Sequence, residues 1–349
     1  MSKSLLSVVR PFALILLGSA GFTALGGNAA ARFPAFTPTA GLPEGIAVDK
    51  SGTVYASVAA FSGTDQLWKF SRSGQAELVA DFGGPSGGAA GLAVDAQGNV
   101  YYCHYLPPNR GVFRVSRGGA VELVPGTDQM VMPNSVAFDP EGALYITETY
   151  SIDPTTGSFG PGGIWRVPRG GVATVWLRDE LLTGVGPTLY PFPVGANGIA
   201  FRQGQLLVVN TDKNLVVEVA VNPDGSPGQP AVWAPIQDVP ESFLYQSPFL
   251  PQLSDGIALD VHGNAYVAIP SREAVVRIDA VTGVQETLGV FPFAALDVPL
   301  SLAFGTGKGE RTQLFITNNG ISAGVIPGLP WSGPGILKID AGTPGLPLP

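Results

Sequence analysis

The sequence predicts an all-β protein of the six-bladed β-propeller class, with four strands in each blade. Three observations support this prediction: a five-residue phrase recurs six times, strands and tight turns follow each copy in the same order, and no segment shows a long helical period. Repeats of roughly 40–50 residues are typical of propeller blades, which are arranged radially around one axis.

The recurring phrase has a variable first residue, then Gly or Ser, an aliphatic residue, Ala and a final apolar residue. Successive copies begin between 44 and 63 residues apart, and the two longest steps contain Gly- and Pro-rich insertions. A parallel β-helix would need shorter and more uniform repeats, and a sandwich would not explain six copies. The copies are Glu44–Val48, Ala90–Val94, Asn134–Phe138, Asn197–Phe201, Asp255–Leu259 and Leu300–Phe304.

Each phrase is expected to form the innermost strand of a blade. A turn with Asp and Gly follows in most copies, as in Asp49–Gly52, and such residues favour tight hairpins. Second strands are then predicted at 54–57, 100–103, 144–147, 206–209, 265–268 and 314–317. Third strands, each with a charged third residue, are predicted at 67–70, 112–115, 164–167, 216–219, 275–278 and 336–339.

An outer fourth strand follows only five of the six copies. These strands are expected near 76–80, 120–124, 173–177, 230–234 and 285–288, whereas the sixth repeat ends in Pro- and Gly-rich coil. An unclosed ring would leave exposed strand edges. We therefore expect the N-terminal strand of the mature chain, within Arg32–Thr39, to supply the missing strand and close the ring.

Residues 1–31 have the order of a secretory signal peptide. Lys3 and Arg10 precede an apolar run from Pro11 to Leu25, and small residues lead to Ala31, so cleavage is expected before Arg32. An uncleaved membrane anchor is the alternative, but Gly interrupts the run and it is shorter than the roughly 20 residues of a membrane span. Residues 32–349 are then one propeller domain that is secreted or periplasmic.

The composition suits one large, acidic domain. Hydrophobic residues make up 45% of the 349 and charged residues only 13%. Loss of the two basic leader residues takes the formal charge from −8 to −10, which argues against nucleic acid and anionic membranes as partners. The single cysteine, Cys103, excludes an intramolecular disulfide.

The first residues of the six phrases should converge near the axis, and four of them carry oxygen donors. Two carboxylates and two amides suit a hard divalent cation, and Ca²⁺ fits this set better than Mg²⁺, which retains more water, or Zn²⁺, which prefers His and Cys. Alternatively, these residues only cap the strand starts. The candidate ligands are Glu44, Asn134, Asn197 and Asp255.

Loops at the same end of the blades are expected to surround this site. They place His104 and Tyr105 where they could contact a substrate, and His104 could also move protons. Five other polar or aromatic residues fall within the same loops, although the two acids among them also fit solvated loop positions. These residues are Glu148, Tyr150, Asn210, Asp212 and Asn318.

Several short motifs resemble the senescence marker protein/gluconolactonase/luciferin-regenerating-enzyme family. They are Pro43–Gly45, Pro133–Asn134, Ala196–Gly198 and Ser254–Asp260, and the last continues into strands at 263–268 and 275–279 that are similar to the fifth blade of that family. The resemblance covers essentially the whole mature chain. It implies a six-bladed propeller with a catalytic divalent metal.

The resemblance also implies residue roles. Glu44, Asn197 and Asp255 match the usual metal ligands of the family, Asn134 matches an asparagine that contacts substrate or completes the metal shell, and Asp255 matches the proposed general base or nucleophile. These roles imply a hydrolase that acts on lactones or related esters, with organophosphate-type esters as a less favoured substrate. The rival interpretation is a non-catalytic ligand-binding or scaffold propeller, like strictosidine-synthase-like or NHL-repeat proteins, with a structural metal or none.

The chain departs from the family in three respects. The segment after Glu44 lacks the usual Pro and aromatic residue, and no arginine occupies the position that contacts sugars in the lactonases. The loops 184–192, 243–253 and 320–334 are longer and more apolar. These departures bear on the sugar substrate more than on the metal site.

Overall fold

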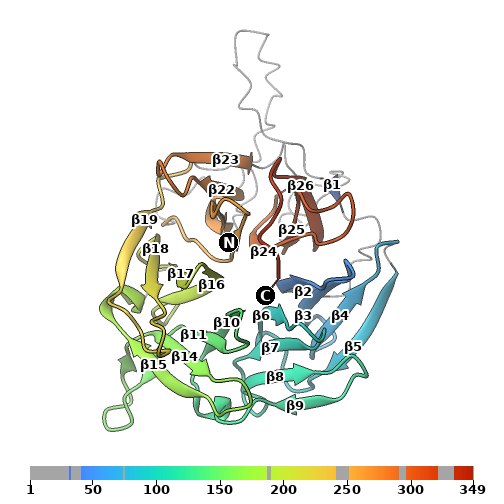
Figure 1. Ribbon diagram of the computed structural model, residues 1–349. Helices are drawn as coiled ribbons and strands as arrows, with labels where there is room; N and C mark the ends of the chain where they lie inside the picture. Colours follow the sequence, from blue (N-terminus) through green and yellow to red (C-terminus); the bar gives the residue numbers. More distant parts are fainter. Residues whose placement is uncertain are drawn as a thin grey trace, which may run out of the picture.

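The computed structural model describes residues 31–32, 41–73, 75–186, 190–240, 251–290, 296–320 and 334–348. Within these residues, six four-stranded antiparallel sheets form a ring around one axis, which confirms the predicted six-bladed propeller (Figure 1). The predicted leader falls outside the described residues except for Ala31, and so does most of the loops 243–253 and 320–334.

Within each blade, the strands follow one another from the axis to the rim. Blade 1 contains β2 (Gly41–Val48), β3 (Val54–Ala60), β4 (Asp65–Phe70) and β5 (Ala76–Asp81). Blade 2 contains β6 (Ala89–Val94), β7 (Val100–His104), β8 (Gly111–Val115) and β9 (Val121–Leu123). Blade 3 contains β10 (Pro133–Phe138), β11 (Leu144–Glu148), β14 (Gly163–Val167) and β15 (Thr174–Arg178).

Blade 4 contains β16 (Ala196–Arg202), β17 (Gln205–Asn210), β18 (Leu215–Ala220) and β19 (Ala231–Pro235). Blade 5 contains β20 (Ile257–Leu259), β21 (Ala265–Ile269), β22 (Ala274–Ile278) and β23 (Gln285–Val290). Blade 6 contains β24 (Pro299–Phe304), β25 (Gln313–Asn318), β26 (Gly335–Asp340) and β1 (Ala31–Arg32). A hairpin of β12 (Ser151–Ile152) and β13 (Phe159–Gly160), and 3₁₀ turns at Thr127–Gln129, Glu180–Leu182 and Pro270–Arg272, complete the described elements.

The ring closes through the N-terminal strand. β1 pairs antiparallel with β26, with Arg32 opposite Leu337, so strands from both ends of the chain share blade 6. This arrangement agrees with the predicted closure, although residues 33–39 lie outside the described part of the chain. In this way β1 covers part of the outer edge of β26 and leaves a short strand at the edge of the sixth sheet.

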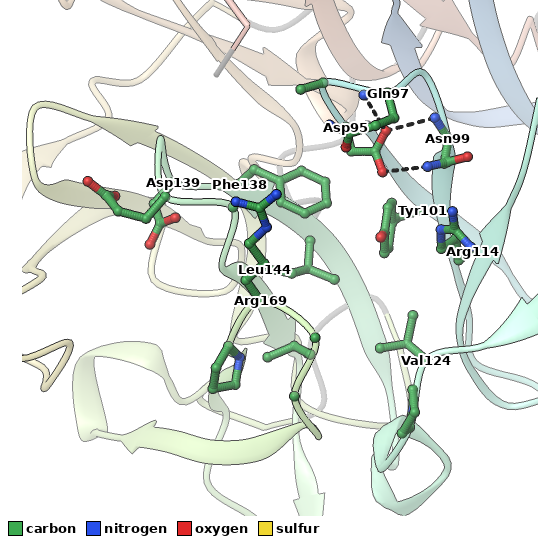
Figure 2. A pocket seen from close by; sticks show the side chains of 18 of the residues that line it. Asp95, Gln97, Asn99, Tyr101, Arg114, Val124, Phe138, Asp139, Leu144 and Arg169 are labelled. Carbon is green, nitrogen blue, oxygen red and sulfur yellow. Dashed lines mark hydrogen bonds between the residues drawn. The ribbon is translucent and has the colours of Figure 1, made fainter.

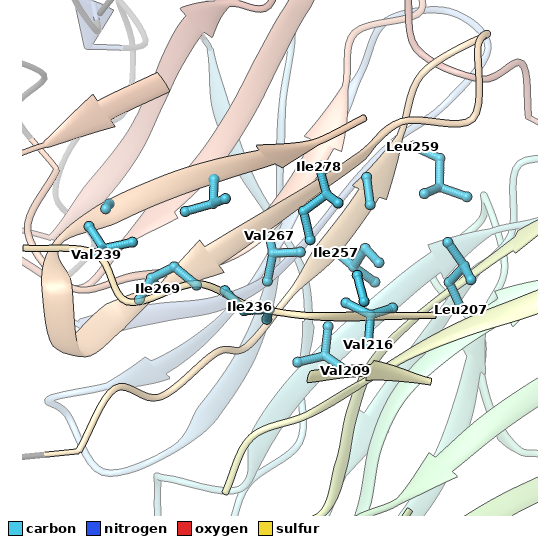
Figure 3. Close-up of a cluster of buried hydrophobic side chains, with 14 residues drawn as sticks. Leu207, Val209, Val216, Ile236, Val239, Ile257, Leu259, Val267, Ile269 and Ile278 are labelled. Atoms are coloured by element: carbon cyan, nitrogen blue, oxygen red, sulfur yellow. The ribbon is translucent and has the colours of Figure 1, made fainter. Parts of the chain in front are cut away.

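Apolar clusters between neighbouring blades hold the ring together. In the cluster between blades 4 and 5, Leu207, Val209 and Val216 of one sheet pack against Ile257 and Val267 of the next (Figure 3). Similar clusters occupy the other five contacts between successive blades. The alternation of residues along each strand therefore fills both faces of a blade with apolar side chains, because each sheet has a neighbour on either side.

The turns after the inner strands use aspartate as predicted. The Asp49 carboxylate accepts hydrogen bonds from the backbone N–H groups of Ser51 and Thr53. Gly52 has φ +87°, a conformation that L side chains rarely adopt. The same pattern recurs at 95–99 and 260–264, so local hydrogen bonds fix the end of these inner strands opposite the phrase starts.

Candidate functional site

The first residues of all six phrases line one cavity. It has a volume of about 300 Å³ and lies where the inner strands begin, at one end of the axis. The structure thus brings together the four candidate ligands, which are separated by as many as 211 positions in the sequence. Around the ring, the six residues are Glu44, Ala90, Asn134, Asn197, Asp255 and Leu300.

A local irregularity in strand pairing turns these residues toward the cavity. In blade 1 the pairing between β2 and β3 shifts between Pro43 and Ile46, so Glu44 and Gly45 lie outside the regular ladder. Equivalent shifts occur at the phrase starts of blades 2, 3, 4 and 6. A bulge of this kind redirects a side chain, and bulges are common beside functional sites.

The second residue of the phrase is small because the blades approach closely there. A Cβ added to Gly45 would lie 2.4 Å from the carbonyl oxygen of Ala90 in the next blade. A Cβ on Gly198 would lie 2.5 Å from the carbonyl oxygen of Asp255. Glycine at these positions therefore permits the backbone approach that gathers the first residues around the axis.

Hydroxyl groups of the second strands tie neighbouring bulges together. The Thr147 hydroxyl accepts a hydrogen bond from the Ser135 N–H at 2.9 Å and donates to the Asn197 carbonyl in the next blade at 2.7 Å. Ser57 likewise accepts from the Gly45 N–H and donates to the Ala90 carbonyl. The Thr147 contact therefore fixes the backbone of a candidate ligand from the preceding blade.

The two carboxylates of the cavity interact unfavourably with each other. Burial raises the pKa of Glu44 well above its ordinary value, and repulsion from the Asp255 carboxylate raises it further. Burial also raises the pKa of Asp255 to about 7, against the opposing effect of a hydrogen bond from the Asn197 side chain. Two acids in such an environment favour a proton or a cation between them.

The two asparagines present acceptor oxygens. The Asn134 Nδ2 donates to the Thr149 hydroxyl at 3.1 Å, and the Asn197 Nδ2 donates to the Thr211 hydroxyl at 3.0 Å. The amide nitrogens thus donate to threonines, and that of Asn197 also donates to the Asp255 carboxylate, so the Oδ1 atoms are the acceptors that remain for a cation. Carboxylate and amide oxygens around one cavity are the ligand set that Ca²⁺ prefers. The residues present therefore fit a hard cation.

This donor set is unlike a zinc site. Across the described residues, no group of three or more His, Cys, Asp and Glu side chains is placed to hold a metal. The candidate set contains two acids, and its other two members are amides. Such a set suits an oxygen-seeking cation and lacks the nitrogen and sulfur ligands of zinc sites.

Tyrosines stand beside the two acids. Tyr105 and Tyr190 both line the cavity. Burial, and then the charges of Asp255 and Glu44, raise the pKa of Tyr190 to about 12, and burial followed by the charge of Glu44 also raises the pKa of Tyr105. Both hydroxyls therefore remain protonated near neutral pH and can donate hydrogen bonds.

The structure does not bring His104 to the cavity. Its side chain is 2% exposed, and its Nε2 lies 2.9 Å from the Asp65 carboxylate of blade 1. Burial opposes ionisation of Asp65, but hydrogen bonds from His104 and from the backbone of Gly87 and Gly88 lower its pKa overall. The expected contact of His104 with substrate is therefore replaced by a contact between blades 1 and 2.

The other polar residues that the sequence places near the site hold neighbouring segments in position. Glu148 is buried and accepts hydrogen bonds from the Trp165 indole and from Arg178. The Asp212 carboxylate accepts from the backbone of Val185 and Val194 and so holds the loop that carries Tyr190.

Asn210 and Asn318 also have backbone partners, so neither faces the cavity as a free group. The Asn210 amide donates to the carbonyl oxygens of Leu181 and Thr183, and the Asn318 Oδ1 accepts from the Asp297 N–H at 2.6 Å. Tyr150 contributes indirectly, because its ring lies 5.4 Å from that of the lining residue Phe192.

The sequence pattern does not identify several of the lining residues. Tyr190 and Phe192 belong to a loop that the sequence distinguishes only by its length and apolar character, and Thr211 and Asn319 follow second strands. The signal for the last two is their position, since each is adjacent in sequence to a polar residue that is predicted near the site.

A second hollow of about 430 Å³ lies at the other end of blades 2 and 3 (Figure 2). It is lined by hairpin turns that follow the inner strands, whereas the cavity lies where those strands begin. The Asp95 carboxylate accepts hydrogen bonds there from the backbone N–H groups of Gln97 and Asn99, and Arg114 forms an ion pair with Glu122. Its polar groups are thus largely engaged in the turns themselves.

Fold and site together define a six-bladed propeller with an acid–amide cluster at one end of its axis. Residues 120–320, more than half of the chain, match the SMP-30/Gluconolactonase/LRE-like region family. The chain belongs to this family. None of the curated proteins matches it significantly.

Solved structures agree on the fold. A putative gluconolactonase from a structural genomics programme has 20% identity and a TM-score of 0.64, with 92% of this chain and 95% of that chain covered. A gluconolactonase from Xanthomonas campestris has 17% identity and a TM-score of 0.61 (97% and 99% covered). A calcium-binding protein, regucalcin, from Agrobacterium tumefaciens has 19% identity and a TM-score of 0.64 (92% and 97% covered).

Proposed function

We propose that the chain is a divalent-cation-dependent hydrolase of lactones or related esters, with Ca²⁺ as the cation. The observation that carries the proposal is that Glu44 and Asp255, from the first and fifth blades, share one cavity with the side chains of Asn134 and Asn197. Family membership adds support, and so does the similarity in fold to a gluconolactonase and to a calcium-binding protein.

Glu44, Asn197 and Asp255 are the proposed cation ligands, and Asn134 completes the shell or contacts the substrate. When bound, the cation supplies Lewis-acid polarisation of a carbonyl oxygen. Glu44 and Asp255 have no cationic side chain beside them among the described residues that line the cavity, so a bound cation would balance their charge.

Asp255 is the proposed general base. Its carboxylate accepts a proton from water as the water oxygen bonds to the carbonyl carbon, and it returns a proton to the ring oxygen as the C–O bond breaks. The products are a hydroxy acid and the regenerated carboxylate. Asp255 lines the same cavity as the other proposed ligands, so it stands beside the place where the cation would polarise the carbonyl.

Tyr105 and Tyr190 are proposed to orient the substrate. Their protonated hydroxyls lie in the wall beside the acids, where they can donate hydrogen bonds to ester oxygens. The charges of both Glu44 and Asp255 act on Tyr190, and the charge of Glu44 acts on Tyr105, so both tyrosines stand close to the proposed reaction centre.

Turnover of a lactone panel, with and without chelator, tests the proposal. We expect chelator to abolish hydrolysis, added Ca²⁺ to restore it, and Asp255→Ala to lower kcat by at least about 100-fold, the usual effect of losing a general base. Asp128→Asn, a change at an exposed acid away from the cavity, should leave kcat unaltered. A calcium-induced rise in melting temperature without turnover of any lactone would instead indicate a non-catalytic ligand-binding propeller.

We also propose that the protein is secreted or periplasmic. The proposal depends on the leader-like order of residues 1–31. Among the described residues, no helix has the length and apolar character needed to cross a bilayer. N-terminal sequencing of the protein recovered from the periplasm or medium should begin at Arg32, and an intact N-terminus in a cytoplasmic fraction would contradict the proposal.

A further inference from the structure

The described side chains that line the cavity are largely apolar and include no cation, which is unusual for a sugar-binding site. Among its described lining residues there is no Lys, Arg or His, so the two acids of the cation site are its only charged groups. An anionic substituent would find no cationic side chain there. The remaining wall is largely apolar, with Met132, Val194, Leu253, Val298 and Leu300 among its members.

Several polar side chains of the wall already form hydrogen bonds with other groups of the protein. The Ser271 hydroxyl accepts from the Leu253 N–H at 2.8 Å, and the Thr211 hydroxyl accepts from Asn197. Ser254 donates to the Asn210 carbonyl at 3.4 Å. A polyhydroxylated ring needs a partner for each hydroxyl that it buries, and each of these wall hydroxyls already has one of its hydrogen-bonding positions taken by the protein.

One wall acceptor is different. The Oδ1 atom of Asn319 is buried at the cavity and has no hydrogen-bond partner among the described residues. It can accept a hydrogen bond from a single donor on a ligand, or from a water molecule.

Aromatic rings gather at one side of the mouth. The Tyr190 and Phe192 rings are stacked with centroids 5.5 Å apart, and Tyr150 packs against Phe192 at 5.4 Å. Tyr190 is 45% exposed, so a large part of its ring is open to a ligand. Aromatic surfaces of this kind favour apolar and planar groups.

On this basis, which rests on the proposed function, we propose that the substrate is an uncharged lactone whose ring carries an alkyl or aryl substituent in place of multiple hydroxyls. The carbonyl lies at the acid–amide cluster, and the substituent lies against Tyr190 and Phe192. The wall thus selects against polyhydroxylated sugar lactones and against anionic esters.

The test compares two six-membered lactones that differ in substituents, δ-decanolactone and glucono-1,5-lactone. Turnover is measured with Ca²⁺, and binding is measured by calorimetry with the corresponding non-hydrolysable lactams, 6-pentylpiperidin-2-one and gluconolactam. We expect the alkyl compound to be favoured by at least about tenfold in both kcat/KM and Kd, as a few buried methylenes allow. Equal or tighter binding of gluconolactam would overturn the inference.

The two assays separate this inference from the proposed hydrolysis. Tight binding of the alkyl lactam with no turnover of either lactone would support the proposed class of ligand and reject the proposed hydrolysis. Turnover of both lactones with preference for the gluconolactone would support the hydrolase and reject the substrate class.

Variants locate the proposed contact. Tyr190→Ala should raise the KM for δ-decanolactone about five- to tenfold, because it removes both the ring against which the substituent packs and a hydroxyl that orients the ester. Tyr190→Phe should retain the preference for δ-decanolactone. This variant distinguishes the contribution of the ring from that of the hydroxyl. Phe61→Ala, at a 67% exposed aromatic outside the cavity lining, is the matched control and should change neither parameter. An unchanged preference in Tyr190→Ala and Phe192→Ala together would overturn the proposed contact.

Discussion

The Thr317 hydroxyl in blade 6 donates a hydrogen bond to the backbone carbonyl of Glu44 in blade 1 at 2.6 Å. The same hydroxyl accepts from the Ser301 N–H at 2.9 Å, so it joins two phrase starts across the closure of the ring. Glu44 is a proposed cation ligand, and its backbone is therefore held by the last blade of the circle. Closure of the propeller and geometry of the site depend on the same contact.

Thr317→Val should weaken both the closure of the propeller and the geometry of the calcium site. Valine has nearly the same shape but leaves the Ser301 N–H and the Glu44 carbonyl without this partner, which costs about 1–3 kcal/mol when the groups are buried. We expect a lower melting temperature and a several-fold loss of calcium affinity, measured by thermal unfolding and calorimetry. Thr174→Val, at an exposed position of β15, is the control for the chemical change alone. Stability lost with unaltered calcium affinity would argue that Thr317 does not position Glu44.

Gly198→Ala should separate blades 4 and 5 at the axis. The added Cβ would lie 2.5 Å from the Asp255 carbonyl oxygen, so the backbone that carries one proposed ligand must shift away from another. Overpacking of this kind typically costs about 1–3 kcal/mol. We expect the loss of calcium-binding free energy in Gly198→Ala to exceed the loss of unfolding free energy. Gly118→Ala, where the nearest atom would be 3.8 Å away, should be neutral, and equal effects in the two variants would contradict this account.

The strands and turns were predictable because their signals are local. Alternating apolar residues and Asp–Gly turns define each hairpin, and six copies of one phrase define the ring. The convergence of Glu44 and Asp255 followed from their equivalent place in the repeat. The close approach of blades at Gly45 and Gly198 and the hydroxyl contacts of Thr147 and Thr317 join residues of different repeats, so no single repeat reveals them.

Side-chain direction and loop conformation limited the prediction of the site. His104 and Tyr105 are neighbours in sequence, but consecutive residues of an extended chain point to opposite sides. Tyr105 therefore faces the cavity, whereas His104 faces Asp65 of blade 1. Tyr190 reaches the acids because Asp212 holds its loop through backbone contacts, and a loop of this length has no periodic pattern from which such a contact could be predicted.

The cation-free protein should become less stable as pH rises from about 4 to about 7. Asp255 has a pKa of about 7 when folded, against about 3.9 when unfolded, so in this range the folded state binds a proton that the unfolded state has lost. Stability must then fall with rising pH across this range, and the raised pKa of Glu44 acts in the same direction. Thermal unfolding with chelator should show a loss of at least about 1 kcal/mol, since one pH unit of linkage to one proton corresponds to about 1.4 kcal/mol.

Saturating Ca²⁺ should abolish this slope, because the calcium-bound protein and the unfolded chain then both carry ionised carboxylates over most of this range. Cation binding requires ionised carboxylates, so affinity increases with pH until Asp255 and Glu44 are deprotonated. Calorimetry between pH 5 and 8 should show tighter binding as pH rises, with proton release at the lower end. In Asp255→Asn the fall in cation-free stability should be smaller. A calcium affinity independent of pH across this range would show that these acids are not the ligands.

The last prediction concerns the segment that follows β26. The Leu346 N–H donates to the Leu259 carbonyl at 2.9 Å, and its side chain packs against the cluster between blades 4 and 5. Leu346–Leu348 thereby border a hollow formed by the ends of the inner strands, whose arrangement around the axis is seen in Figure 1. Leu346→Ala should lower the free energy of unfolding by about 1 kcal/mol, because the side chain is only partly buried.

Catalysis and calcium affinity should remain unchanged in Leu346→Ala, since this segment lies at the far end of the axis from the acid–amide cluster. Val281→Ala, at a side chain that is 92% exposed, controls for the loss of apolar volume and should leave stability within about 0.5 kcal/mol of the parent. Chemical denaturation measures both variants. A Leu346→Ala protein that lost calcium binding while it kept its stability would mean that the two ends of the axis are coupled, which the separate contacts of the tail and of Glu44 do not predict.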